Sequence, residues 1–290
     1  MLKFGISLFF TEYSMKPADL ALELEQRGFE SVWSGEHSHV PAVMKTPFPG
    51  EGGIKRHYYD VMDPFVTLTA AAMVTKSLKI GTGVCLIPQR DPIQTAKLVA
   101  SIDQISRGRF LFGTGDGWNQ EEIENHGADF KTRHKRARES IEAMKAIWTR
   151  TKAEYHGDIV SFDAMMTWPK PVQKPHPPVL VGGAFPYSAR RAIGYGDGWL
   201  PSAPKGKTDI LDEVPRFRQM AAEAGRDPAS MPITAWYPPR SLDLMLRYRE
   251  IGLDRAVFTV PSAGPDEVLP ALDEIGAIMA KVNGSNSPND

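Results

Sequence analysis

The sequence predicts a single (β/α)8 TIM-barrel domain, on the basis of three observations. Its 290 residues can bury a large core, and α/β barrels of this length commonly form one domain. Short apolar runs alternate with amphipathic helical segments along almost the whole chain. Eight strand–helix units can be counted, which argues against the alternative of a doubly wound open sheet. We expect the domain to span residues 1–282 and the polar segment 283–290 to be a frayed tail.

Each expected strand is a short apolar run, and each expected helix follows a strand. The strands are Lys3–Phe9, Ser31–Trp33, Leu78–Val84, Phe110–Phe112, Val179–Val181, Gly198–Leu200, Ile233–Trp236 and Ala256–Val260. The helices are Pro17–Arg27, Asp63–Thr75, Asp91–Ile105, Lys135–Trp148, Ser188–Tyr195, Asp209–Ala224, Ser241–Ile251 and Pro265–Val282. Two of the helices open with Asp-Pro, which combines a good N-cap with the residue best suited to the first turn.

Three segments lie outside this alternation. Residues 38–60 are rich in proline and glycine, and so long a connection in a compact domain is usually functional or mobile. Tyr155–Phe162 is interpreted as one additional strand. Residues 168–178 carry many prolines, which favour an extended path. This last segment resembles a domain linker, but a buried strand follows it at once, so we interpret it as an insertion in one domain.

Composition excludes several classes of protein. A formal net charge of −1 gives no electrostatic basis for binding nucleic acid or an anionic membrane. No apolar run approaches the roughly 20 residues of a membrane span, and the first ten residues do not resemble a signal peptide. Cys85 is the only cysteine, so disulfides within the chain and cysteine-rich metal sites are excluded. We expect a soluble, cytoplasmic protein in which the basic run 131–138 is a solvated helix face.

The candidate functional residues are those at the C-terminal ends of the strands, where active sites of this fold lie. Glu36 and His37 form a polar pair after the second strand. The other candidates are Gly83 and Val84 after the third strand, Asp116, Gly117 and Trp118 after the fourth, Gly182, Gly183 and Ala184 after the fifth, and Trp199, Pro201 and Ser202 at the sixth. Glycines at three of these ends suit a flat ring resting on the backbone, or a phosphate held by amides.

Two of these glycine-rich turns lead directly into helices. Residues 113–119 hold three glycines in five positions, and Asn119 can cap the next helix, whose first turn carries Glu121 and Glu122. The Gly182-Gly183 turn before the helix at Ser188 predicts a phosphate cradle made of helix N-terminal amides. The alternative in both places is an ordinary strand-to-helix turn, which needs glycine in any case.

The combination of motifs resembles the luciferase-like monooxygenase superfamily, and within it the coenzyme F420-dependent oxidoreductase branch. The motifs are Gly113-Thr114-Gly115-Asp116-Gly117-Trp118-Asn119 with Glu121-Glu122, Lys170-Pro171-Val172-Gln173-Lys174-Pro175-His176-Pro177-Pro178 leading into Val181-Gly182-Gly183, Gly196-Asp197-Gly198-Trp199-Leu200-Pro201, Asp63-Pro64-Phe65 and Ile80-Gly81-Thr82-Gly83-Val84. They span most of the chain. These motifs are specific for the superfamily. They distinguish much less well between the flavins that could be bound, and they indicate almost nothing about the substrate.

The resemblance implies a flavin or deazaflavin across the strand ends. In this family the ring lies against a bulge with a non-prolyl cis peptide after the third strand, which here is Gly83–Val84. Gly182, Gly183 and Ala184 would hold the phosphate, while Asp116, Gly117 and Trp118 would line the cofactor. Arg90 and Arg133 are candidate phosphate or carboxylate partners, with surface ion pairing as the alternative for each.

The resemblance also implies catalytic roles for Glu36 and His37. They match an acidic–histidine pair after the second strand, and a histidine sits near the reactive ring in the bacterial luciferase relatives. Imidazole suits proton transfer beside a hydride or peroxide step; the alternative is a structural histidine. His39 and His57 are weaker candidates, and His126, His134, His156 and His176 are given no role. Residues 38–60 would form a substrate-side lid or simply a variable loop, with contacts from Trp33, Phe48, Tyr58 and Tyr59.

Three functions remain open at this stage. The first is F420-dependent hydride transfer to or from a small organic substrate. The second is an FMN-dependent monooxygenase that uses O2 and a separate flavin reductase. The third is a flavin-binding barrel without turnover. No metal site is expected, because the redox chemistry belongs to the ring and no further ligands accompany Glu36 and His37. A homodimer is expected by analogy with relatives, and the substrate is not identified.

Overall fold

Eight parallel strands form a closed barrel in the computed structural model, which describes residues 1–50, 52–201 and 209–284. The strands are β1 (Lys3–Leu8), β2 (Ser31–Ser34), β3 (Lys79–Thr82), β5 (Phe110–Gly115), β8 (Val179–Gly183), β9 (Gly198–Pro201), β10 (Thr234–Trp236) and β11 (Arg255–Thr259). They pair in the order β10-β11-β1-β2-β3-β5-β8-β9, and a parallel bridge between Trp199 and Ile233 joins the two ends. The predicted (β/α)8 fold is confirmed.

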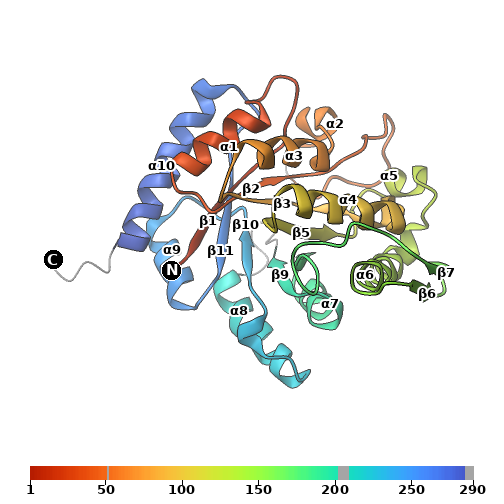
Figure 1. Cartoon of the computed structure of the whole chain (residues 1–290). Helices are drawn as coiled ribbons and strands as arrows, with labels where there is room; N and C mark the ends of the chain where they lie inside the picture. Colours follow the sequence, from red (N-terminus) through yellow and green to blue (C-terminus); the bar gives the residue numbers. More distant parts are fainter. Residues whose placement is uncertain (51, 202–208, 285–290) are drawn as a thin grey trace.

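Helices surround the barrel on its outer side (Figure 1). They are α1 (Pro17–Gln26), α3 (Pro64–Val74), α4 (Pro92–Ile105), α6 (Arg133–Thr149), α7 (Tyr187–Tyr195), α8 (Ile210–Glu223), α9 (Leu242–Glu250) and α10 (Pro265–Gly284), with the short helices α2 (His57–Asp60) and α5 (Gln120–Asn125) in the loops. Asp63 and Asp91 cap α3 and α4 through their carboxylates, as the Asp-Pro pairs predict. Because α10 continues to Gly284, the predicted helix end at Val282 is two residues short.

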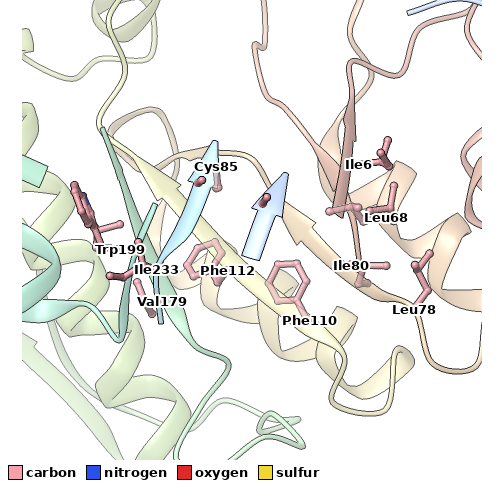
Figure 2. Close-up of a cluster of buried hydrophobic side chains, with 14 of the residues drawn as sticks. Ile6, Leu68, Leu78, Ile80, Cys85, Phe110, Phe112, Val179, Trp199 and Ile233 are labelled. Carbon is pink, nitrogen blue, oxygen red and sulfur yellow. The ribbon is translucent and has the colours of Figure 1, made fainter. Parts of the chain in front are cut away.

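The hydrophobic core lies in two layers, one on each side of the strands. Residues that point outward pack against the helices; Figure 2 shows Phe110 and Phe112 of β5 between Ile80 on one side and Val179 on the other. Residues that point inward fill the barrel. They are Trp33, Leu111, Leu180, Leu200 and Val257, with Val84 and Trp236 packed on them. The filled interior leaves the strand ends as the face available for a ligand.

Three predicted elements differ from the structure. Tyr155–Phe162 is not one strand, because β6 (Ala153–His156) and β7 (Ser161–Met165) form an antiparallel hairpin. Its turn is held by Glu139, whose Oε2 accepts the amides of Ile159 and Val160 at 2.8 and 3.0 Å. The third strand ends at Thr82, and after a break the chain pairs again with β5 as β4 (Cys85–Leu86). The lid segment contains helix α2.

Within the described ranges, none of the helices has both the length and the apolar character needed to cross a membrane.

Candidate active site

His37 is held by a buried carboxylate that the sequence did not single out as its partner. His37 Nδ1 lies 2.8 Å from Glu122 Oε2, and the two side chains are only 7% and 1% exposed. The other oxygen of Glu122 accepts the amide of Ser38 at 3.1 Å, while Asn119 caps the helix by accepting the Glu122 amide at 3.0 Å. An ionised carboxylate only accepts hydrogen bonds, so Nδ1 carries the proton and Nε2 has a lone pair to offer.

Aromatic rings enclose this histidine. The His37 ring centroid lies 5.3 Å from that of Tyr58 and 6.0 Å from that of Trp118. Phe48 of the lid contacts both neighbours, at 5.3 Å from Tyr58 and 5.5 Å from Trp118. Burial raises the pKa of Tyr58, so its hydroxyl remains a donor at neutral pH. The lid, the second strand and the turn after β5 therefore meet at His37.

Glu36 is engaged in a different network, below the lid. Its Oε2 accepts the amide of Leu86 at 2.7 Å, and its Oε1 accepts Arg90 Nε at 2.6 Å. Arg90 continues to Asp63 Oδ2 at 2.8 Å. A carboxylate that accepts hydrogen bonds from an arginine and from the Leu86 amide holds β4 in position. These contacts suit a positioning residue, and the predicted catalytic role of Glu36 stays a prediction. Arg90 is paired with two carboxylates of the protein itself, as in the ion-pairing alternative, although its side chain is only 17% exposed.

A cavity of about 360 Å³ lies beside the two networks. Its lining includes Glu36, His37, Gln89, Arg90 and His126. At its rim Ser38 Oγ lies 2.8 Å from His39 Nδ1 and 2.6 Å from His126 Nε2. His126, to which no role was given, thus belongs to the surroundings of His37.

The bulge after β3 has the geometry that the family resemblance implies. The Gly83–Val84 peptide bond is cis, as predicted. Among the described residues it is the only cis peptide bond that does not precede a proline. A Cβ on Gly83 would lie 2.1 Å from Cη2 of Trp236, so no other residue fits there without moving the indole. Val84 points toward β5 and β8, where its methyl groups lie 2.5 Å from a Cβ built on Gly115 and 3.1 Å from one built on Gly182. The bulge thus rests on glycine-lined strand ends.

The end of β8 has a backbone conformation that favours glycine. Gly183 has φ +128°, a conformation that side chains rarely adopt. Ser188 Oγ donates to Gly183 O at 2.7 Å and accepts Trp199 Nε1 at 2.9 Å, which joins the turn to α7. Ala184 is exposed beside them. The Arg191 guanidinium lies over the turn, its Nη2 3.4 Å from a Cβ built on Gly183.

Asp116 does not point freely at the mouth of the barrel, because it is paired with cations. Its Oδ2 contacts His134 Nδ1 and lies 3.2 Å from Arg191 Nε, and the side chain is 8% exposed. Arg133, the residue before His134 on α6, interacts electrostatically with both Asp116 and Arg191. The Nε atoms of Arg133 and Arg191 are buried, and neither has a hydrogen-bond acceptor in the part of the chain that the structure describes. The expectation that the basic run is a solvated helix face is therefore wrong at Arg133, whereas His134 is 46% exposed although it contacts Asp116.

Other sequence candidates have different places. Trp199 is fully buried between β9 and the helices, where it stacks on Phe217 at 4.8 Å. Trp33 is fully buried in the barrel interior, so it is a core residue and not a lid contact. Tyr59 is 55% exposed, and Ser202 falls outside the described residues. Across the part of the chain that the structure describes, no group of three histidine, cysteine or acidic side chains is arranged to hold a metal ion.

The fold and the strand-end site together define a TIM-barrel protein with an aromatic-lined histidine site beside a cis-peptide bulge. The chain belongs to the luciferase-like monooxygenase family, whose model matches residues 13–239. An uncharacterised protein of Mycobacterium tuberculosis is 35% identical over 96% of this chain and 98% of its own length. The F420-dependent hydroxymycolic acid dehydrogenase of that organism is 30% identical over 71% of this chain and 54% of its own.

Similarity extends to both cofactor classes of the family. The FMNH2-dependent dimethylsulfone monooxygenase of Pseudomonas putida is 31% identical over 74% of this chain and 54% of its own. The structure of an F420-dependent secondary alcohol dehydrogenase, solved with an F420–acetone adduct, superposes with a TM-score of 0.73 at 19% identity, covering 97% of this chain and 99% of that one. The likeness to that structure concerns the fold alone.

Proposed function

We propose that the protein is an F420-dependent oxidoreductase that moves a hydride between the deazaflavin and a small organic substrate at His37. The observation that carries this proposal is the buried His37–Glu122 pair, enclosed by aromatic rings beside the Gly83–Val84 bulge. It is supported by the relative from Mycobacterium tuberculosis that is named as an F420-dependent dehydrogenase.

The residues present fit such a cofactor at both of its ends. Within the described residues, the buried Nε–H groups of Arg191, beside Gly183, and of Arg133 lack acceptors, and phosphate oxygens would supply them. Gly182, Gly183 and Ala184 would hold the phosphate through backbone, and Asp116 would lie beside it through its pairing with Arg191. Gly117 and Trp118 would line the middle of the cofactor. Gly83 and Val84 would support the ring from below.

His37 is suited to move a proton at Nε2. When bound, the deazaflavin supplies a ring carbon that takes or gives the hydride. The hydride leaves the substrate carbon as an electron pair, so the substrate's heteroatom must lose its proton in the same direction of reaction. His37 Nε2 would accept that proton, and Glu122 would stabilise the resulting imidazolium through Nδ1. The rings of Phe48, Tyr58 and Trp118 would exclude water from this step.

The test is a binding titration followed by a histidine substitution. The purified protein is titrated with F420 and with FMN, following the fluorescence of each cofactor. We expect saturable binding of F420, and tight binding of FMN without binding of F420 would overturn the proposal. In H37Q we expect F420 binding to persist and turnover with any accepted substrate to fall by about a hundredfold; unchanged turnover would remove His37 from the mechanism.

A second candidate function is an FMN-dependent monooxygenase that uses O2 and receives reduced flavin from a separate reductase. The relative from Pseudomonas putida supports it. Reduced FMN supplied by a reductase, with oxygen uptake as the readout, separates this function from the first. A flavin-binding barrel without turnover is the third; cofactor binding with no reaction across a panel of alcohols and ketones would favour it.

A further inference from the structure

The charge at the end of β8 is unusual because a carboxylate stands among the cations. Arg191 brings a positive charge to the Gly183 turn and is paired with the Asp116 carboxylate, and Arg133 lies close enough to interact electrostatically with both. Arg133, Arg191 and Asp116 together carry a net charge of +1. If the turn served only to attract phosphate, an acidic residue there would be counterproductive, since it lowers the attraction for any anion.

The group is also incompletely satisfied. Arg191 Nε lies 3.2 Å from Asp116 Oδ2, yet the contact lacks hydrogen-bond geometry, and this Nε–H has no acceptor. Arg133 Nε has none either, although its Nη1 donates to the carbonyl of Phe130 at 2.8 Å. Tyr195 follows Arg191 by one helical turn; its side chain is 9% exposed, and its buried hydroxyl has no partner. Buried donors without acceptors at one place indicate a site for an oxygen-rich anion.

Nearby charges do not alter this balance. Further along α6, Arg138 and Glu142 pair at 3.9 Å and cancel one another, and Lys135 is paired with Asp158 in the hairpin turn. Burial lowers the pKa of Arg133, Asp116 raises it and Arg191 lowers it, so all three charges act on one another. Burial, and then the charge of Asp116, raise the pKa of Tyr195, which keeps its hydroxyl protonated as a donor.

We propose that Asp116 sets the charge of this anion site, so that it selects a phosphate with one negative charge over a phosphate with two. The proposal rests on the proposed function, and it names Asp116 as the residue that separates the two cofactor classes. The phosphate of F420 is a diester with a single charge, whereas that of FMN is a monoester with a charge of about −1.5 to −2 at pH 7. A monoanion would neutralise the +1 group, and a dianion would leave an excess negative charge partly buried, which is costly.

The test compares Asp116→Asn with the wild type by binding alone. Dissociation constants for F420 and FMN are measured by fluorescence titration. We expect the wild type to prefer F420, and we expect D116N to shift the FMN-to-F420 affinity ratio by at least about tenfold toward FMN. Asp158→Asn is the matched control. Like Asp116, Asp158 is paired with a basic residue of α6, but its side chain is 78% exposed in the hairpin. The FMN-to-F420 affinity ratio of D158N should equal that of the wild type.

Two small phosphate esters test the anion site without the flavin or deazaflavin ring. Methyl phosphate is a monoester and dimethyl phosphate a diester, and their binding is followed by phosphorus NMR. D116N should tighten methyl phosphate by a similar factor and dimethyl phosphate by less, because the gain grows with the charge of the anion. The result that would overturn the inference is an FMN-to-F420 affinity ratio in D116N equal to that of the wild type, provided that the two proteins have the same stability. That result would leave F420 binding intact. If neither ring cofactor binds, the proposed function fails, and the two methyl esters still decide the role of Asp116.

His134→Gln provides a second variant should D116N fold poorly. It removes the His134–Asp116 contact but keeps the Asp116 charge, so the preference for the diester should persist. Loss of the preference in H134Q would assign it to the contact and not to the charge, and would also overturn the proposal.

Discussion

His37 Nδ1 and Glu122 Oε2 are joined at 2.8 Å across 85 positions of sequence. The pair fixes the tautomer of the imidazole and gives it a counter-charge for the protonated state. Neutralising the carboxylate should therefore weaken the histidine as a base without removing it from the site.

We expect Glu122→Gln to lower kcat by at least about tenfold, because the protonated imidazole loses its ionic partner. Cofactor affinity should change little. Steady-state kinetics with the first accepted substrate provide the measurement. Glu124→Gln is the control, since Glu124 lies on the same short helix, is exposed and only accepts from Gln120 at 2.7 Å. Equal activity of E122Q and E124Q would contradict a role for the pair.

The lid is fastened to the helix after β5 by Glu121. Its Oε1 accepts the amides of Lys45 and Thr46 at 2.7 and 3.1 Å, and its Oε2 accepts Thr46 Oγ1 at 2.7 Å. Glu121→Gln should weaken this attachment. We predict faster amide hydrogen exchange in residues 43–48, with exchange in β5 unchanged. Protection of the lid equal to the wild type would mean that the aromatic contacts of Phe48 alone hold it.

Gly83 should tolerate no side chain. Gly83→Ala places a methyl group 2.1 Å from Trp236 Cη2, and the indole must then leave its place above the filled barrel. Overpacking of this kind costs about 1–3 kcal/mol in the free energy of unfolding. Urea denaturation measures the loss. In the double variant with Trp236→Leu the loss should be smaller than the sum of the two single losses; strict additivity would show that the methyl group and the indole do not meet.

Stability should fall at acid pH through Glu30. Burial alone would raise the pKa of Glu30, but the two hydrogen bonds from Arg255, at 2.7 and 2.6 Å, lower it to about 2. Because this pKa lies below the ordinary value of 4.5, the ionised form stabilises the fold above about pH 4.5, and the contribution is lost as the pH falls toward 2. We expect a loss of roughly 2–3 kcal/mol from this group.

Urea unfolding at pH 7 and pH 3 measures this effect. Glu30→Gln should be less stable than the wild type at pH 7, and the difference should shrink at pH 3. A difference that stays constant with pH would show that the Glu30–Arg255 pair does not contribute through its charge.

The sequence by itself determined the barrel and the strand ends that form its mouth. Alternation of strands and helices repeats along the chain, and the Asp-Pro caps and glycine turns mark where helices begin, so local patterns were sufficient. The cis bond at Gly83–Val84 followed from the family resemblance, and the structure has it. One strand was predicted at residues 155–162, where a hairpin forms, because the turn depends on Glu139 of a neighbouring helix.

Only the tertiary structure decided which side chains meet at that mouth. His37 with Glu122, and Asp116 with Arg191, come from separate strand–helix units, and no local pattern links their positions. Glu36 faces Arg90 and not the aromatic enclosure, a direction fixed by the turn that follows β2. Closure of the barrel brings the ends of all eight strands to one ring, and this closure places cations from α6 and α7 around the Asp116 carboxylate. Local propensity forms the units, and their closure into a ring forms the site.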